Sequence, residues 1–410
     1  MAARNRRQQA GSRQTLAQAV VAILAAGATY AWAMGLTPPP PVRHLAAPEA
    51  SLVRALLDIR DHNFSSALEH VDTALAANPN FRLAQLVKGD LLLARSRPIS
   101  TLGNAAGATA DQMDGLRQEA RARLARYRIE PPSDLAPRYL LQLPESEKFA
   151  LVLDSANSTL FVFQNDGGKP RYVADYYVTV GKNGTEKLRE GDKRTPIGVY
   201  HVTSKLSKNK LTDFYGSGAF PINYPNEWDM MRGRNGYGIW LHGTPRDTYS
   251  RPPRASDGCI VLTNDDLQTL ERRLQIGSTP VVIADSLEWA KPDEVEALKS
   301  DLSAAIERWR RDWESRNTDT YLRHYARSFS SGGANLAQWS AQKRQVNAGK
   351  AWIKVRLSDM TLLLYPGKQE LAVAIFDQDY SSSNLSNRMK KRQYWLREDG
   401  RWRIVYEGAA

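Results

Sequence analysis

The sequence predicts a multidomain α+β protein with a helical segment, a mostly-β domain and a second α+β domain. Apolar residues recur at helical spacing over residues 51–94, and short β-rich runs separated by glycine, asparagine and proline fill residues 148–285. A long amphipathic helix and several β runs then occupy residues 294–408. A chain of 410 residues is long enough for two or three domains, and these changes of hydrophobic period mark their expected boundaries.

Residues 1–36 are typical of an export signal. Four arginines and no acidic residue precede an almost wholly apolar run at 16–36, which predicts that the N-terminus stays inside and the rest is exported to the periplasm or another extracytoplasmic space. The run approaches the minimum spanning length and favours an uncleaved signal anchor in the inner membrane, although Ala31-Trp32-Ala33 also fits the cleavage site of a signal peptide. The four prolines that follow predict a stiff Pro-rich spacer over 37–50.

Residues 51–137 are expected to form a helical segment. The pattern from Phe64 to Gly89, broken at Asn78-Pro79, resembles a single tetratricopeptide repeat, and an ordinary helical hairpin fits equally well. One repeat leaves an apolar face uncovered. We therefore expect this tetratricopeptide-like segment to dock on the β-rich domain, on a second copy of the chain in a homodimer, or on a protein partner.

Residues 294–408 predict one or two helices followed by a curved antiparallel sheet. Five apolar residues fall on one helical face, at Leu298, Leu302, Ile306, Trp309 and Trp313. Four β runs follow, at 351–357, 360–365, 370–380 and 391–396, and Asp399-Gly400 predicts a hairpin into a last strand at 402–406. Four further tryptophans are expected in the core rather than on a ligand-binding surface, namely Trp339, Trp352, Trp395 and Trp402.

This order of helices and strands resembles the nuclear-transport-factor-2-like cone. The resemblance implies a fold that often encloses a pocket and that serves dimerisation or ligand binding. It gives no chemistry by itself, because function depends on the site and not on the fold.

Cys259 is the only cysteine, which excludes an intrachain disulfide. Cys259 and His242 each end an apolar run beside a glycine, which is typical of rigid strand ends with accessible tips. A thiol needs a nearby base or positive charge to become a strong nucleophile, and an imidazole can supply that base. A lone cysteine is more often an inert core residue. A free thiol that persists outside the cytoplasm, however, favours a catalytic role.

The motifs around these two residues resemble the L,D-transpeptidase (YkuD-type) catalytic domain of bacterial cell-wall enzymes. The resemblance covers residues 148–285 and includes His-Gly-Thr at 242–244, Ser-x-Gly-Cys-Ile-x-Leu at 256–262 and Gly-Asp-Lys-Arg-Thr-Pro at 191–196. It implies that Cys259 is the nucleophile, His242 its base and Gly243 the residue whose carbonyl orients the imidazole. The family usually has a second histidine at Asp257 and an arginine at Val261, so the chain departs from the pattern there.

The resemblance implies a substrate, the stem tetrapeptide of peptidoglycan, cut between its diamino acid and the terminal D-alanine. Transfer of the acyl group to an amine is transpeptidation, a transferase reaction of cell wall biogenesis, and transfer to water is the hydrolase reaction of an L,D-carboxypeptidase. The three-part layout is similar to L,D-carboxypeptidases that set helical cell shape in some Gram-negative bacteria. A non-catalytic wall-binding scaffold is the alternative of another class, and the presence of both Cys259 and His242 argues against it.

The remaining site predictions concern the oxyanion hole and the substrate. Backbone N–H groups of Gly258 and Cys259 are the candidate oxyanion hole, because glycine permits close approach. Guanidinium groups pair with carboxylates, so the candidate substrate-binding residues are Arg246, Arg251, Arg254, Ser256 and Asp257. Asp257 is expected to raise the thiol pKa. Its side chain could instead point away from the sulfur, hold His242 or position a water.

The charge balance limits the partners. A net charge of +12 favours anionic surroundings such as cell-wall polymer or anionic lipid. The basic residues are scattered without a compact patch interleaved with aromatics, so no nucleic-acid partner is expected. The histidines do not cluster with carboxylates at ligand spacing, so neither a metal nor another cofactor is expected.

Overall fold

The computed structural model describes residues 46–410 except 97–98, 100, 105–108 and 129–130. The expected anchor or signal peptide and most of the Pro-rich spacer therefore lie outside the described residues. Within the part that is described, no helix combines the length and apolar character that a bilayer crossing requires.

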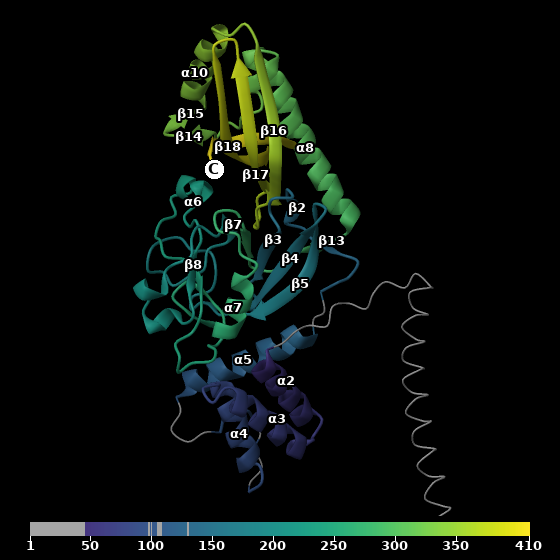
Figure 1. Ribbon diagram of the computed structural model, residues 1–410, viewed down its shortest axis with the longest axis vertical. Coiled ribbons are helices and arrows are strands. Elements are labelled where there is room, and N and C mark those ends of the chain that lie inside the picture. Colours follow the sequence, from purple (N-terminus) through teal and green to yellow (C-terminus); the bar gives the residue numbers. More distant parts are fainter. Residues whose placement is uncertain (1–45, 97–98, 100, 105–108, 129–130) are drawn as a thin grey trace, which may run out of the picture. The chain divides into compact units, whose positions relative to one another are not determined.

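The described residues of the helical segment form the helices α2 (Ala47–Arg60), α3 (Phe64–Ala77), α4 (Arg82–Leu93) and α5 (Ala110–Arg128) (Figure 1). Helix α2 begins inside the expected spacer, because Pro48 suits the first turn of a helix. Helices α3 and α4 form the predicted hairpin, and α5 contacts both α2 and α4. Their apolar faces share one buried cluster with Tyr249 of the β-rich domain. The segment therefore docks on that domain, which is one of the expected alternatives.

The β-rich domain contains a five-stranded sheet with the strand order β5-β4-β3-β12-β7. Its strands are β3 (Phe149–Asp154), β4 (Thr159–Asp166), β5 (Lys169–Tyr177), β7 (Gly198–His201) and β12 (Pro280–Ala284). Strand β12 runs parallel to β3 and antiparallel to β7. Leu151 and Leu153 of β3 pack in one apolar cluster and Val152 in another, because alternate side chains point to opposite faces. The sheet is thus buried on both faces, as its nearly continuous apolar runs predict.

A three-stranded sheet, in the order β11-β9-β8, lies against the first of these clusters. Its short strands are β8 (Ala219–Pro221), β9 (Trp240–His242) and β11 (Ile260–Val261). Strand β10 (Arg254–Ser256) pairs with β6 (Val180–Gly181), and helices α6 (Glu227–Met231) and α7 (Asn264–Glu271) complete the domain. The small sheet positions both residues of the predicted catalytic pair, because His242 ends β9 and Cys259 immediately precedes β11.

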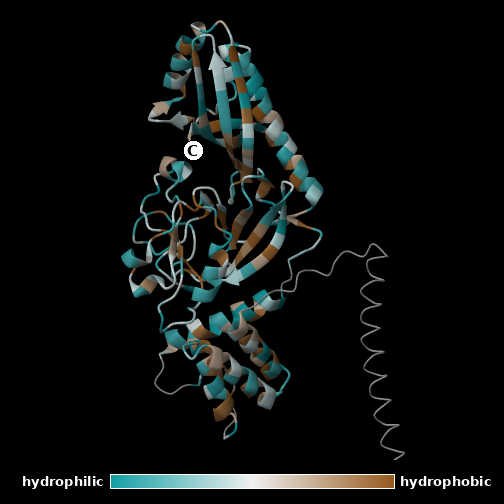
Figure 2. Cartoon of the chain, in the orientation of Figure 1, coloured by the Kyte–Doolittle hydropathy of each residue, from teal (hydrophilic) through white to brown (hydrophobic). Residues whose placement is uncertain are grey.

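The C-terminal domain is a second five-stranded sheet with the order β19-β18-β17-β16-β2, and the long helix α8 (Pro292–Glu314) packs along it (Figure 1). Its strands are β16 (Ile353–Leu364), β17 (Leu371–Ser382), β18 (Leu385–Glu398), β19 (Arg401–Ala409) and β2 (Leu140–Gln142). Hydrophilic and apolar stretches alternate along the strands, and the outward side of α8 is largely hydrophilic (Figure 2). Two shorter helices, α9 (Thr318–Leu322) and α10 (Leu336–Ala348), and the strand pair β14 (Ser330–Ser331) and β15 (Ala334–Asn335) complete it.

Several details of this domain differ from the sequence prediction. The runs expected at 351–357 and 360–365 are one strand, β16, whose register shifts around Asp359, a residue with φ of 53°. Strand β2, from the segment that precedes the catalytic domain, joins the C-terminal sheet by pairing with β16. Trp395 and Trp402 are buried as predicted, and Trp339 is partly buried. The prediction for Trp352 is wrong: it is 45% exposed, because it lies just before β16 begins.

Candidate active site

Strand pairing brings His242 and Cys259 onto one face of the small sheet. Strands β9 and β11 run parallel, with Leu241 opposite Ile260 and His242 opposite Val261. Continuing this register by one residue places Cys259 beside Trp240. Alternate residues of a strand share a face, so Trp240, His242 and Cys259 point to the same side. Leu241 and Ile260 point to the other side, into the core.

His242 is buried, and its Nδ1 lies 2.7 Å from the carbonyl oxygen of Gly243. A carbonyl can only accept, so Nδ1 carries the proton and Nε2 is left as an acceptor. Burial lowers the pKa of His242 to about 4, and the positive charge of Arg251 acts in the same direction. The rings of Phe214 and Tyr215 flank the imidazole at centroid distances of 5.8 and 5.2 Å. The imidazole is therefore neutral at neutral pH, with its acceptor nitrogen available as a base.

Cys259 is partly exposed, and its thiol donates to the carbonyl oxygen of Gly238 at 3.3 Å. Burial of the sulfur raises the pKa of the Cys259 thiol, although the backbone N–H of Trp240 and the charge of Arg251 oppose this shift. The resting pair is thus a neutral thiol and a neutral imidazole. This arrangement suits a general base that removes the thiol proton during attack, rather than a thiolate formed beforehand.

The rate of Cys259 alkylation by iodoacetamide is expected to rise continuously with pH and to level off only above the ordinary thiol pKa of about 8.5. The reason is that the thiolate is the reactive form, and burial disfavours it. Because Cys259 is the only cysteine, mass spectrometry of the whole chain measures its rate directly. A plateau of high reactivity between about pH 5 and pH 7 would indicate a preformed thiolate–imidazolium pair instead.

The turn before Cys259 is fixed by two buried hydroxyl groups. Thr195 Oγ1 donates to the carbonyl oxygen of Gly258 and accepts from the N–H of Gly181, both at 2.9 Å. Ser256 Oγ donates to the carbonyl oxygen of Cys259 at 2.6 Å and accepts from the N–H of Gly258 at 3.1 Å. Gly258 has φ of 125°, and a Cβ there would lie 2.8 Å from the carbonyl oxygen of Arg194. Glycine is therefore required in this turn.

These contacts bear on two of the predicted roles. Ser256, a predicted substrate-binding residue, is buried with its hydroxyl engaged in the turn, so the structure places it as a positioning residue for Cys259. The N–H of Gly258, a predicted oxyanion donor, points at Ser256 Oγ. The N–H of Cys259 itself remains the better candidate for an oxyanion donor.

Asn264 holds the other half of the site, and its role was not predicted. Its Oδ1 accepts from the N–H of Ser217 at 2.7 Å and its Nδ2 donates to the carbonyl oxygen of Thr244 at 2.8 Å. A Cβ on Gly243 would lie 2.1 Å from the same Oδ1, so the loop after His242 packs directly on this amide. The N-cap of α7 is Thr263, whose hydroxyl accepts from the N–H of Asp266, so the Asn264 side chain is directed at the loop after His242.

The predicted substrate-binding residues differ in exposure and in the groups they contact. The Arg251 guanidinium is half-buried, 4.7 Å from the ring centroid of Phe214. Arg246 is 94% exposed and pairs with Asp213. Arg254 is exposed on β10. Asp257 is 65% exposed, and Lys182 Nζ lies 3.1 Å from its Oδ1, so its carboxylate points into solvent. Their role in substrate binding stays a prediction. Arg251 acts on both His242 and Cys259, while the charge of Asp257 adds to burial in raising the pKa of the Cys259 thiol, as the sequence predicts.

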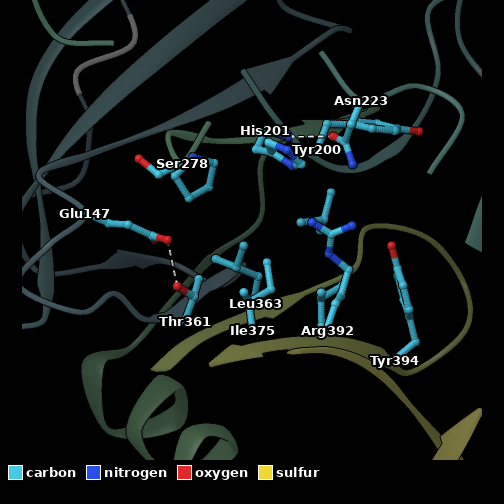
Figure 3. A pocket seen from close by; sticks show the side chains of 13 residues that line it. Glu147, Tyr200, His201, Asn223, Ser278, Thr361, Leu363, Ile375, Arg392 and Tyr394 are labelled. Carbon is cyan, nitrogen blue, oxygen red and sulfur yellow. Dashed lines mark hydrogen bonds between the residues drawn. The ribbon is translucent and has the colours of Figure 1, made fainter. Parts of the chain in front are cut away.

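A small pocket lies where the catalytic domain meets the C-terminal sheet (Figure 3). Its free volume of about 20 Å³ accommodates one water molecule. Burial raises the pKa of Glu147 to about 7 and lowers that of His201 to about 4, while Thr361 donates to Glu147 at 2.9 Å and Arg392 also lines the space. The pocket contains no cysteine, so it belongs to the junction between domains and not to the thiol chemistry.

Comparisons with known proteins agree with the fold and the site. Residues 148–283 match the L,D-transpeptidase catalytic domain family (YkuD), and residues 301–408 match the Cds6 C-terminal NTF2-like domain. Bd1075 of Bdellovibrio bacteriovorus is 30% identical with a TM-score of 0.60, and the match covers 68% of this chain and 98% of that one. The helical cell shape determining protein Pgp2 of Campylobacter jejuni is 26% identical with a TM-score of 0.57, covering 66% of this chain and 95% of that one.

A search of curated proteins found no match.

A catalytic domain with a thiol and a neutral imidazole on one sheet face, joined to an NTF2-like domain, defines an enzyme of the cell-wall L,D-transpeptidase class. The chain belongs to the YkuD-type L,D-transpeptidase family, in the two-domain arrangement that Bd1075 and Pgp2 share. The family and the C-terminal fold predicted from the sequence are confirmed.

Proposed function

We propose that the stem tetrapeptide of peptidoglycan acylates the enzyme at Cys259, with cleavage between its diamino acid and the terminal D-alanine. Family membership supports the substrate class. The observation that carries the chemistry is the hydrogen bond between His242 Nδ1 and the Gly243 carbonyl, because it leaves Nε2 unprotonated on the sheet face where Cys259 lies.

In the proposed reaction, His242 Nε2 takes the thiol proton while the sulfur attacks the carbonyl carbon of the diamino acid. The backbone N–H of Cys259 stabilises the oxyanion that forms. When the C–N bond breaks, His242 returns the proton to the nitrogen of D-alanine, which leaves as a neutral amine. The product is a thioester between Cys259 and the shortened peptide.

The thioester passes its acyl group to an amine, which yields a cross-link, or to water, which yields a tripeptide. We propose transpeptidation as the first candidate on the family match. Hydrolysis by an L,D-carboxypeptidase is the second candidate, and the likeness to Pgp2, a helical cell shape determining protein, over 95% of its length favours it. Either reaction needs the protein outside the cytoplasm, where the predicted export signal would deliver it.

Incubation of the purified protein with disaccharide tetrapeptide, followed by mass analysis, tests the proposal. We expect a transient adduct on Cys259 and release of D-alanine, with either a cross-linked dimer or a disaccharide tripeptide as the second product. The ratio of dimer to tripeptide distinguishes the two candidates. Unchanged substrate together with an unmodified Cys259 would leave the wall-binding scaffold as the remaining interpretation.

A further inference from the structure

The loop at 245–253, between His242 and Cys259, is held by the helical segment rather than by the catalytic domain alone. Tyr249 is only 4% exposed, and its ring lies 4.4 Å from that of Phe81 at the start of α4. Tyr249 is part of the apolar cluster formed by the helices themselves. The middle of this loop therefore belongs to the core of the helical segment.

Contacts on both sides of Tyr249 extend this attachment along the loop. Asn80 Nδ2 donates to the carbonyl oxygen of Arg246 at 3.1 Å, and Ser250 Oγ donates to Glu119 Oε1 at 2.7 Å. Gly115 of α5 lies so close that a Cβ there would be 3.1 Å from Pro252 Cγ. The helices thus hold the loop at four points.

A buried ion cluster fixes the helix that makes these contacts. Arg123 Nε lies 3.0 Å from Glu119 Oε1, and Arg123 Nη1 lies 2.8 Å from Glu49 Oε1. The same guanidinium stacks 4.0 Å from the ring centroid of Tyr177, whose hydroxyl donates to the carbonyl oxygen of Arg251 at 2.9 Å. Arg123 therefore connects the helical segment to the loop by two routes, to the Ser250 hydroxyl through Glu119 and to the backbone of Arg251 through Tyr177.

Arg251 is the loop residue that reaches the catalytic pair. Its guanidinium lies over Phe214, and the Phe214 ring in turn packs against the ring of His242. Because Ser250 and Pro252 are attached to the helices, the position of the Arg251 side chain depends on contacts made outside the catalytic domain. The match to the YkuD family begins at residue 148 and does not include these helices.

We propose that the helical segment is a positioning module of the active site, which holds loop 245–253 so that Arg251 presents its positive charge to an anionic ligand beside Cys259. The identity of that ligand as a carboxylate of the stem peptide rests on the proposed function. The placement of the Arg251 charge is independent of the proposed function, because it follows from the contacts between the helical segment and loop 245–253.

The charge at the thiol is measured by comparing two alkylating reagents of similar size, iodoacetate, which is anionic, and iodoacetamide, which is neutral. A shift of the thiol pKa changes both rates, so the ratio of the two rates isolates the field of nearby charges. We expect Arg251→Ala to lower the ratio of iodoacetate to iodoacetamide rates by roughly five-fold, the effect of one charge at short range in water. Arg251→Lys, which keeps a positive charge, is expected to show a rate ratio between those of Arg251→Ala and the wild type.

The decisive variant is Tyr249→Ala combined with Ser250→Ala, which keeps Arg251 but releases its loop. In this double variant we expect the ratio of iodoacetate to iodoacetamide rates to fall. The fall in its logarithm should be at least half of the fall seen in Arg251→Ala. Tyr127→Ala, the same substitution at an exposed position near the end of α5, is the control and is expected to leave the ratio unchanged. Circular dichroism and thermal unfolding verify that each variant is folded.

An unchanged ratio in the folded loop variant would overturn the proposal, and so would an equal loss in Tyr127→Ala. Alkylation requires no peptidoglycan, so this measurement is independent of the proposed reaction. An enzyme that fails to turn over tetrapeptide and still shows the expected ratios would refute the proposed function and leave the positioning role in place.

Discussion

Replacing Cys259 with serine is expected to abolish turnover of disaccharide tetrapeptide, with a loss of at least about 10³-fold in kcat. A hydroxyl is a much weaker acid than a thiol, and an imidazole whose pKa lies near 4 is too weak a base to activate it. His242→Ala is expected to lower kcat by roughly 10²- to 10⁴-fold, the usual contribution of a general base. Product formation measured by mass over time gives both values.

His70→Ala is the matched control for the histidine variant, because His70 lies on α3 and pairs with Asp58, away from the thiol. It is expected to keep wild-type turnover. Thermal unfolding of the Cys259 and His242 variants should remain close to that of the wild type, since neither substitution removes a large apolar side chain. Turnover near the wild-type rate in Cys259→Ser or in His242→Ala would remove the proposed mechanism.

The candidate catalytic pair could be identified from sequence because its evidence is local. Cys259 and His242 each stand at the end of an apolar run beside glycine, and those short motifs are specific. Thr195 and Asn264 were not predicted as site residues, because their roles depend on backbone groups of distant segments, such as Gly258 and Ser217. The direction of the Asp257 side chain was equally inaccessible, since it is set by pairing with Lys182.

The fold could be predicted at the level of domains, because hydrophobic period identifies helices and strands. Which strands pair is not encoded locally, so the addition of β2 to the C-terminal sheet was missed. The two short runs that form β16 were separated because the bulge around Asp359 interrupts the alternation of apolar residues. The docking of the helices was expected only as one of several alternatives, since the buried charges that hold them look like surface charges in the sequence.

These buried charges lead to the second large effect, which is on stability. Arg123→Met is expected to lower the free energy of unfolding by about 3–5 kcal/mol at neutral pH, because it leaves the buried Glu119 carboxylate without its guanidinium partner and removes one of the two partners of Glu49. Burial by itself raises the pKa of Glu49, but the charges of Arg126 and Arg123 hold that pKa below its ordinary value. The pKa of Glu119 is raised, because burial outweighs the charge of Arg123. Urea unfolding followed by tryptophan fluorescence measures the change.

Arg121→Met serves as the control, since Arg121 lies on the exposed side of α5, and it is expected to change the free energy of unfolding by less than about 0.5 kcal/mol. The difference between wild type and Arg123→Met should shrink as the pH falls toward about 5, because the Glu119 carboxylate, without its guanidinium partner, then takes up a proton in the folded variant. A difference below about 1 kcal/mol at neutral pH would show that the cluster is not a significant attachment.

The double variant Glu119→Leu with Arg123→Met separates two explanations for that loss. If the penalty comes from an unpaired carboxylate, removing Glu119 as well should recover at least half of the lost stability, because Glu49 keeps its contact with Arg126 at 2.7 Å. If the penalty comes from lost packing of the Arg123 guanidinium on Tyr177, the double variant should be no more stable than the single one. The first outcome means that the penalty in Arg123→Met is that of a buried Glu119 carboxylate without its guanidinium. Acid loosening of the segment that holds the Arg251 loop is expected from Glu49 and not from Glu119, because only the pKa of Glu49 is held below its ordinary value, so that its stabilising contribution is lost as the pH falls.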